Sequence, residues 1–139
     1  MDRKSGIILE SEVLDFQLKR HLVQTLNDFS EYFSQEHFER KSHPESFRNM
    51  MRVRAKMASR VKALIETGEI QVTVGVDKGL SFGHRFDEYR ERVVPIIVIP
   101  ISCVFDSSAI KPMILGTNFL PGMISRYRRL KAVGAIRND

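Results

Sequence analysis

The spacing of the apolar residues changes at Gly68, and this change restricts the possible folds more than any other feature. Before Gly68, apolar residues recur every three or four positions, as on one face of an α-helix. After it, aliphatic residues alternate with polar or small ones: Ile70, Val72, Val74 and Val76. Helical and strand patterns occupy separate parts of the chain, which predicts an α+β fold.

Two helices are predicted in the first half of the chain. The first is expected to begin with Ser11 as its N-cap and to end near Arg40, the range over which the apolar stripe has helical spacing. Ser42 and Glu45 have the spacing of a capping box, so a second helix is expected from there to about Thr67, with Gly68 as the C′ residue that follows it. The short connection between the two predicts a helical hairpin.

The segments that follow predict a small β-sheet. Residues 70–76 and 80–86 both alternate, and the turn-forming residues 77–79 lie between them, so they are expected to pair as a β-hairpin. Residues 87–92 are polar and are expected to form a solvated connection. The sheet is predicted to be mostly antiparallel.

Residues 93–105 are apolar at both strand parities, which is typical of a strand covered on both faces. Pro95 and Pro100 each remove a backbone donor, so two short strands, or one strand with a bulge, are expected there. A short helix is predicted over residues 123–133, ended by Gly134.

A chain of 139 residues can bury roughly two-thirds of its unfolded surface, enough for one core. We therefore predict a single α+β domain over residues 1–139. It consists of an N-terminal two-helix hairpin packed on a small, mostly antiparallel sheet, with a short C-terminal helix.

The net charge of +5 favours an anionic partner, such as nucleic acid, an acidic protein surface or a lipid headgroup layer. Four basic residues recur at every fourth position of the second predicted helix, and we call them the basic row: Arg48, Arg52, Lys56 and Arg60. Like charges at this spacing repel by a few tenths of a kcal/mol per pair. The row therefore predicts a contact with nucleic acid or an acidic protein, and the alternative is a solvated face.

The predicted C-terminal helix carries a second basic group, made up of Arg126, Arg128 and Arg129. These residues surround an apolar stripe instead of forming one row. The alternatives are again an anionic-partner contact and a solvated exterior.

Arg54 differs from the other basic residues because it falls on the apolar face of its predicted helix. One interpretation is that its stem is buried while its head pairs with a carboxylate of the first helix: Asp28, Glu31 or Glu36. The other is that this face is an interface with another chain.

No catalytic or metal-binding motif is present in the sequence. The lone Cys103 lies in an apolar run and is expected to be buried. His84, with Asp87 and Glu88, is the nearest approach to an acid–base cluster, but it shares strand parity with phenylalanines and is expected in the core or at its edge. We expect no cofactor, no metal and no enzymatic activity.

The segment KGLSFG, residues 78–83, shares Lys78, Gly79 and Phe82 with the octamer of the RNA-recognition motif. Leu80 and Gly83 depart from that octamer, and the order of helices and strands differs from that fold. Membership of that family is excluded. Phe82 and Phe86 are accordingly expected to be core residues and not platforms for bases.

The leading hypothesis is a non-catalytic structural or adaptor subunit of a larger assembly, for example a viral or phage particle. It would form homo- or hetero-oligomers and turn a basic helix face toward an anionic partner. The alternatives are a free-standing, sequence-nonspecific DNA- or RNA-binding protein and an enzyme with a site near His84. No signal peptide is recognised and the 93–105 run is too short for a membrane helix. The protein is therefore expected to be soluble, not inserted in membranes and not secreted, either in the cytoplasm or within an assembled particle.

Overall fold

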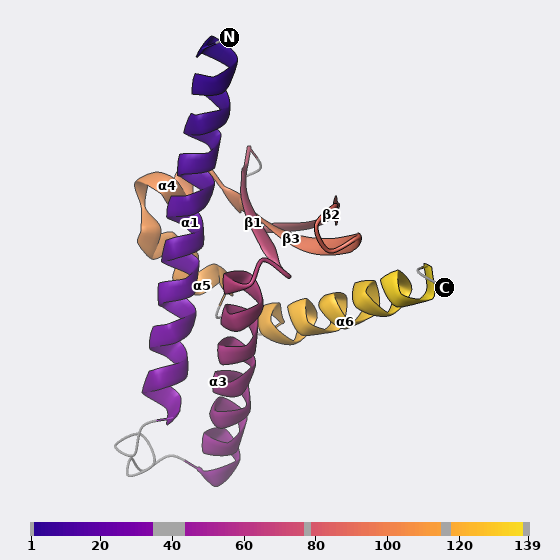
Figure 1. Ribbon diagram of the computed structural model, residues 1–139. Helices are drawn as coiled ribbons and strands as arrows, with labels where there is room; N and C mark the ends of the chain where they lie inside the picture. Colours follow the sequence, from indigo (N-terminus) through magenta and orange to yellow (C-terminus); the bar gives the residue numbers. More distant parts are fainter. Residues whose placement is uncertain (1, 35–43, 77–78, 115–117, 138–139) are drawn as a thin grey trace.

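The computed structural model describes residues 2–34, 44–76, 79–114 and 118–137 and has the predicted α+β class (Figure 1). Two long helices, α1 (Asp2–Ser34) and α3 (Glu45–Glu66), lie side by side and lead into three strands. Three short helical segments follow, α4 (Ser102–Phe105), η1 (Ser107–Ala109) and α5 (Ile110–Ile114). Helix α6 (Phe119–Arg137) closes the described chain and leaves α3 at a steep angle.

The helix boundaries differ from the prediction at the start of the chain. Helix α1 begins at Asp2, so Ser11 is an interior residue and not an N-cap. No proline precedes it, and an interior serine costs only a few tenths of a kcal/mol relative to alanine, so nothing ends the helix there. The predicted end at Arg40 and the predicted cap Ser42 lie outside the described residues.

The end of α3 is as predicted. Gly68 has a φ of 80°, the left-handed conformation that glycine adopts easily after a helix. Its N–H donates to the carbonyl of Ile65 at 3.1 Å, which satisfies one of the free acceptors at the helix terminus. At the other end, Pro44 occupies the N-cap position and makes no side-chain capping bond.

The sheet is mixed, with strand order β1-β3-β2. Strand β1 (Gln71–Gly75) pairs in parallel with β3 (Arg92–Pro100), whereas β2 (Ser81–Asp87) pairs with β3 in antiparallel fashion. The expected hairpin between residues 70–76 and 80–86 is therefore wrong. The hairpin joins β2 to β3 instead, and its turn lies within residues 87–92, which were expected to form a solvated connection.

The pairing follows from the hydrophobicity of the three strands. Strand β3 is apolar at nearly every position, and the central place in a sheet covers it with neighbours along both edges. Strands β1 and β2 alternate in polarity and take the two edges. The tight turn between β2 and β3 places Glu91 at a φ of 53°, in the left-handed region.

Strand β3 is unbroken, contrary to the expectation drawn from its prolines. Its ladder with β1 begins at Ile96 and ends at Pro100. Ile101 donates its N–H to the carbonyl of Gly75, so odd positions of β3, including Pro95, face β1, and Pro95 lies just before that ladder. Pro100 faces the β2 side, where the ladder already ends at Val98, so neither missing donor interrupts a ladder. The chain then leaves the sheet, and residues 102–105 form α4 instead of a second strand.

The helices cover one face of the sheet and form the core with it. Ile97 and Ile99 of β3 pack there in one cluster with Leu18 and Leu22 of α1 and Met123 of α6, and all five are fully buried. The predicted C-terminal helix lies within α6, which continues past Gly134 to Arg137. One glycine costs about 1 kcal/mol in a helix, too little to end this one.

The opposite face of the sheet is covered by polar side chains. Val94 and Ile96 are buried although they do not belong to the core under the helices. Gln71 of β1 accepts a hydrogen bond from Arg85 Nη1 (3.3 Å) and donates one to Asp87 Oδ2 (3.4 Å), both on β2. Because β3 lies between these strands, the bonds pass over it, so β3 is covered on both faces as predicted.

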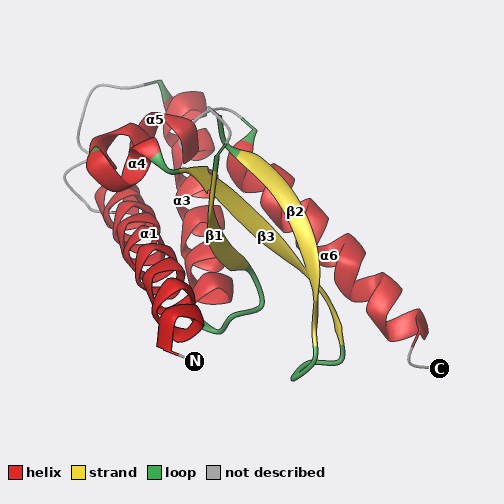
Figure 2. Cartoon of the chain, turned by 90° about the horizontal axis from the view of Figure 1, so that it is seen from above, coloured by secondary structure: helices red, strands yellow, loops and turns green. Residues whose placement is uncertain are grey.

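The two edges of the sheet have different neighbours. Asp15 of α1 accepts hydrogen bonds from the backbone N–H of Val74 (2.9 Å) and the hydroxyl of Thr73 (3.2 Å), so α1 closes the edge of β1. Figure 2 shows α1 beside β1 and α6 along the β2–β3 hairpin. Strand β2 forms the other edge.

Candidate functional site

A polar cluster around Glu69 joins α6 to the sheet. Glu69 accepts hydrogen bonds from Tyr127 Oη and from Arg92 Nη2, each at 2.6 Å, and Lys131 Nζ lies 3.3 Å from the same tyrosine oxygen. The bond from Tyr127 is the main reason that the pKa of the Glu69 carboxyl lies below its usual value. Both carboxylate oxygens are engaged within the fold, so this cluster is structural.

A second polar cluster holds the hairpin turn against the end of α3. Asp87 Oδ2 accepts a bond from Arg90 Nη1 at 2.7 Å, and Asp87 Oδ1 accepts one from the backbone N–H of Tyr89 at 3.0 Å. Arg90 also donates to the carbonyl of Thr67. The bond from Arg90 is the largest cause of the lowered pKa of the Asp87 carboxyl.

The acid–base cluster considered around His84 is not assembled. His84 was expected in the core or at its edge, but it is exposed on the edge strand β2 and is not a core residue. Asp87 projects from the opposite face of that strand, because odd and even positions alternate, and its oxygens are bonded to neighbours. Cys103, in contrast, is fully buried as predicted, and burial raises the pKa of its thiol. In the part of the chain that the structure describes, no three His, Cys, Asp or Glu side chains gather closely enough to hold a metal ion.

The basic row does not form one exposed stripe. Arg48 and Arg52 are half-buried, whereas Lys56 and Arg60 are exposed. Each four-residue step advances about 40° beyond a full helical turn, so the row winds roughly a third of the way around α3. Arg52 and Lys56 line a groove between α1 and α3, so the row follows this helix pair instead of a flat outer face.

The second basic group divides in the same way. Arg126 is half-buried, with its guanidinium carbon 5.3 Å from the ring centre of Phe82, while Arg128 and Arg129 are exposed. Of the basic row and the second basic group, the structure leaves four residues exposed, and these lie on two helices and not in one array: Lys56, Arg60, Arg128 and Arg129.

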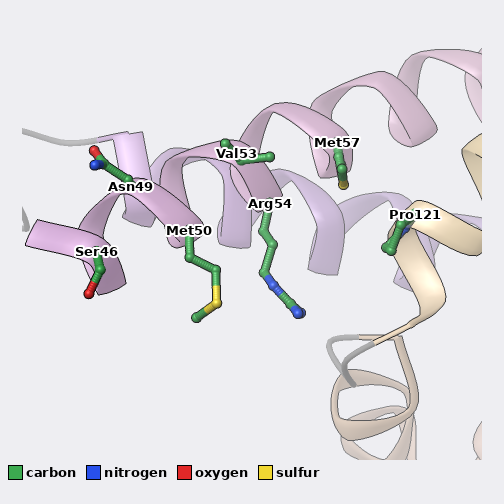
Figure 3. Close-up of a pocket in the computed structure, with 7 residues that line it drawn as sticks. All are labelled: Ser46, Asn49, Met50, Val53, Arg54, Met57 and Pro121. Carbon is green, nitrogen blue, oxygen red and sulfur yellow. The ribbon is translucent and has the colours of Figure 1, made fainter.

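Arg54 lies in a groove lined mainly by apolar side chains, shown in Figure 3. The groove has a volume of about 410 Å³ and is formed by α3 and the start of α6, with these lining residues: Ser46, Asn49, Met50, Val53, Arg54, Met57 and Pro121. We call it the α3–α6 groove. Met50 is 46% exposed and Val53 is 52% exposed, high values for such side chains. The Arg54 side chain points into this groove, and Asp28 lines a separate groove beside α5. Glu36, another of the carboxylates considered as a partner of Arg54, lies outside the described residues.

Two features of the surface were not predicted from the sequence. Pro121 completes the α3–α6 groove from a position far along the chain, and only the Met-rich, Arg-containing face of α3 indicated it. Phe82 and Phe86 were expected in the core but are 39% and 53% exposed. They lie on the edge strand β2, while α6 packs mainly against the central strand β3, so the rings are only partly covered.

Comparison with known proteins gives no functional assignment. No known protein family matches the chain, and no curated protein or solved structure shows significant similarity to it. Within the described ranges, none of the helices is both long enough and apolar enough to cross a bilayer.

Proposed function

We propose that the protein is a non-catalytic adaptor or structural subunit that binds another protein chain through the α3–α6 groove. The single observation that carries this proposal is an open, apolar groove with one cation, Arg54, at its lining. Exposed Met50 and Val53 are costly to leave in water unless a partner covers them.

The chemistry of the groove indicates the class of partner. Grooves lined by methionine and aliphatic side chains accept the apolar face of an amphipathic helix, and methionine adapts to its shape. A carboxylate on that helix would complement Arg54, and the net charge of +5 favours acidic partners at long range. The expected occupant is therefore an amphipathic helix with apolar residues at i, i+3, i+4 and i+7 and an acidic residue beside them.

The basic row has a secondary role in this proposal. None of its four members lines the α3–α6 groove. Exposed Lys56 and Arg60 would speed association with an acidic partner and contribute little to the lifetime of the complex.

The proposal is tested by selecting binders from a display library of amphipathic helices, using the full chain as bait. Enriched sequences are expected to share an acidic position at a fixed register, with dissociation constants in the micromolar range, roughly −8 kcal/mol. Substitution of Val53→Glu should weaken binding at least tenfold, because it places a charge in the apolar contact.

Ala63→Glu is the matched control, since Ala63 is exposed on α3 and does not line the groove. The proposal is wrong if no helix is enriched, or if Val53→Glu and Ala63→Glu bind the enriched helices equally well.

A further inference from the structure

A second surface of the molecule combines aromatic rings with arginine. On β2, alternate residues project to the same side of the sheet, and here they are Phe82, His84 and Phe86. All three are exposed, although this is the side on which α6 packs. A strand that presents three ring side chains in a row to solvent leaves apolar surface uncovered, which indicates a binding role.

Helix α6 supplies the charge beside these rings. The Phe82 ring lies 5.9 Å from that of Phe119, and the Arg126 guanidinium carbon lies 5.3 Å from the Phe82 ring centre. Arg129 is exposed three residues after Arg126, so both project from neighbouring positions of the helix. The acidic residues Glu88 and Glu91 lie in the hairpin turn, beyond Phe86, and mark one end of this basic surface.

We infer that this surface, which we call the β2–α6 surface, binds single-stranded nucleic acid. Alternate residues on a strand are roughly 7 Å apart, a spacing at which successive bases of an extended strand can each meet one ring. Bases stack on exposed aromatic side chains without regard to sequence, and arginines beside the rings neutralise phosphates. Double-stranded nucleic acid does not fit this chemistry, because its bases are already stacked on one another.

This inference goes beyond the proposed protein-binding function and uses different residues. It also moves the nucleic-acid contact away from the basic row, where half-buried Arg48 and Arg52 reduce access to phosphates. The exposed rings of the edge strand β2, which are not part of the core, form the contact instead of the basic row.

The test is a fluorescence anisotropy titration of the full chain against labelled oligo(dT) and oligo(U) of about twelve nucleotides, repeated over a series of NaCl concentrations. Phe86→Ala should weaken binding about tenfold, the loss expected for one stacked base, without changing the dependence on salt. Arg129→Gln should lower the slope of log affinity against log salt by about 0.7, the value for one phosphate of a single strand. Phe105→Ala is the matched control, because that ring is 86% exposed on α4, outside this surface.

Binding of either oligonucleotide with these responses supports the inference, and the tighter of the two identifies the nucleic acid as DNA or RNA. The inference is overturned if neither oligonucleotide binds at low salt, if a duplex of the same length binds equally well, or if Phe86→Ala leaves the affinity unchanged. Loss of binding on replacing the four row residues by Gln, with Phe86→Ala silent, would assign the site to the basic row. Val53→Glu should leave oligonucleotide binding intact, because Val53 lines the α3–α6 groove and not the β2–α6 surface. Failure of the nucleic-acid inference is therefore distinguishable from failure of the proposed protein binding.

Discussion

The hydrogen bond between Tyr127 and Glu69 offers a quantitative test of how α6 is fixed to the sheet. The substitution Tyr127→Phe removes one hydroxyl and leaves the ring, which is 4% exposed, in place. A hydrogen bond to a charged group contributes about 1.5–3 kcal/mol. The Glu69 side chain is 26% exposed and keeps its bond from Arg92, so the lower end, about 1.5 kcal/mol, is expected. That loss corresponds to a decrease of about 5 °C in the melting temperature.

The pH dependence shows whether the bond involves a charged carboxylate. The folded-state pKa of Glu69 is lowered, so its stabilisation is fully present above the unfolded value of about 4.3. It is lost as the pH falls through the folded-state pKa. The difference in unfolding free energy between wild type and Tyr127→Phe should therefore be largest at pH 7 and should shrink as the pH falls to 3.

The assay is urea unfolding followed by circular dichroism at the two pH values. Tyr89→Phe is the matched control, because it removes the same hydroxyl from a ring that is 90% exposed, and no measurable change is expected. The reasoning is refuted if Tyr127→Phe costs the same at pH 3 as at pH 7, or no more than Tyr89→Phe.

Four further substitutions, one of them a control, test the fold by the same unfolding assay. A Cβ at Gly75 would overlap with Val98 Cγ1, so Gly75→Ala should cost about 1–3 kcal/mol, whereas Gly83→Ala, with open space around it, should be neutral; equal effects would contradict the packing. Glu91→Gly should stabilise the hairpin turn by about 0.5–1 kcal/mol, because Glu91 is in the left-handed region, and a loss of stability would argue against that turn. Asp15→Ala should cost about 1–2 kcal/mol, because it leaves the backbone N–H of Val74 and the hydroxyl of Thr73 without this acceptor, and a neutral result would mean that α1 does not close this edge.

The sequence predicts the local elements of the fold better than their partners. The helical stripe, the alternation of β1 and the glycine at the end of α3 are local signals, and the structure follows them. Strand pairing is not a local property. The alternation of residues 70–76 and 80–86 fits a hairpin equally well, but the greater hydrophobicity of β3 decides the order by placing it in the centre.

The same limit applies to the candidate sites. The sequence identified Arg54 as a cation on an apolar face, but the groove around it needs Pro121, which only tertiary packing brings to α3. Phe82 and Phe86 have the parity of core residues, and only the edge position of β2 explains why they are exposed. The winding of the basic row follows from helix geometry, yet the burial of Arg48 and Arg52 depends on the fold around α3.

The measurement that tests the central claim most directly is a charge exchange across the α3–α6 groove. Two labelled helical peptides, identical except for Glu or Lys at the position facing Arg54, are titrated against wild type and Arg54→Glu, with circular dichroism confirming that both proteins fold. Wild type is expected to prefer the Glu peptide by about tenfold, and Arg54→Glu to prefer the Lys peptide. Equal binding of the two peptides by wild type, or a preference that does not invert in Arg54→Glu, would contradict docking through this groove.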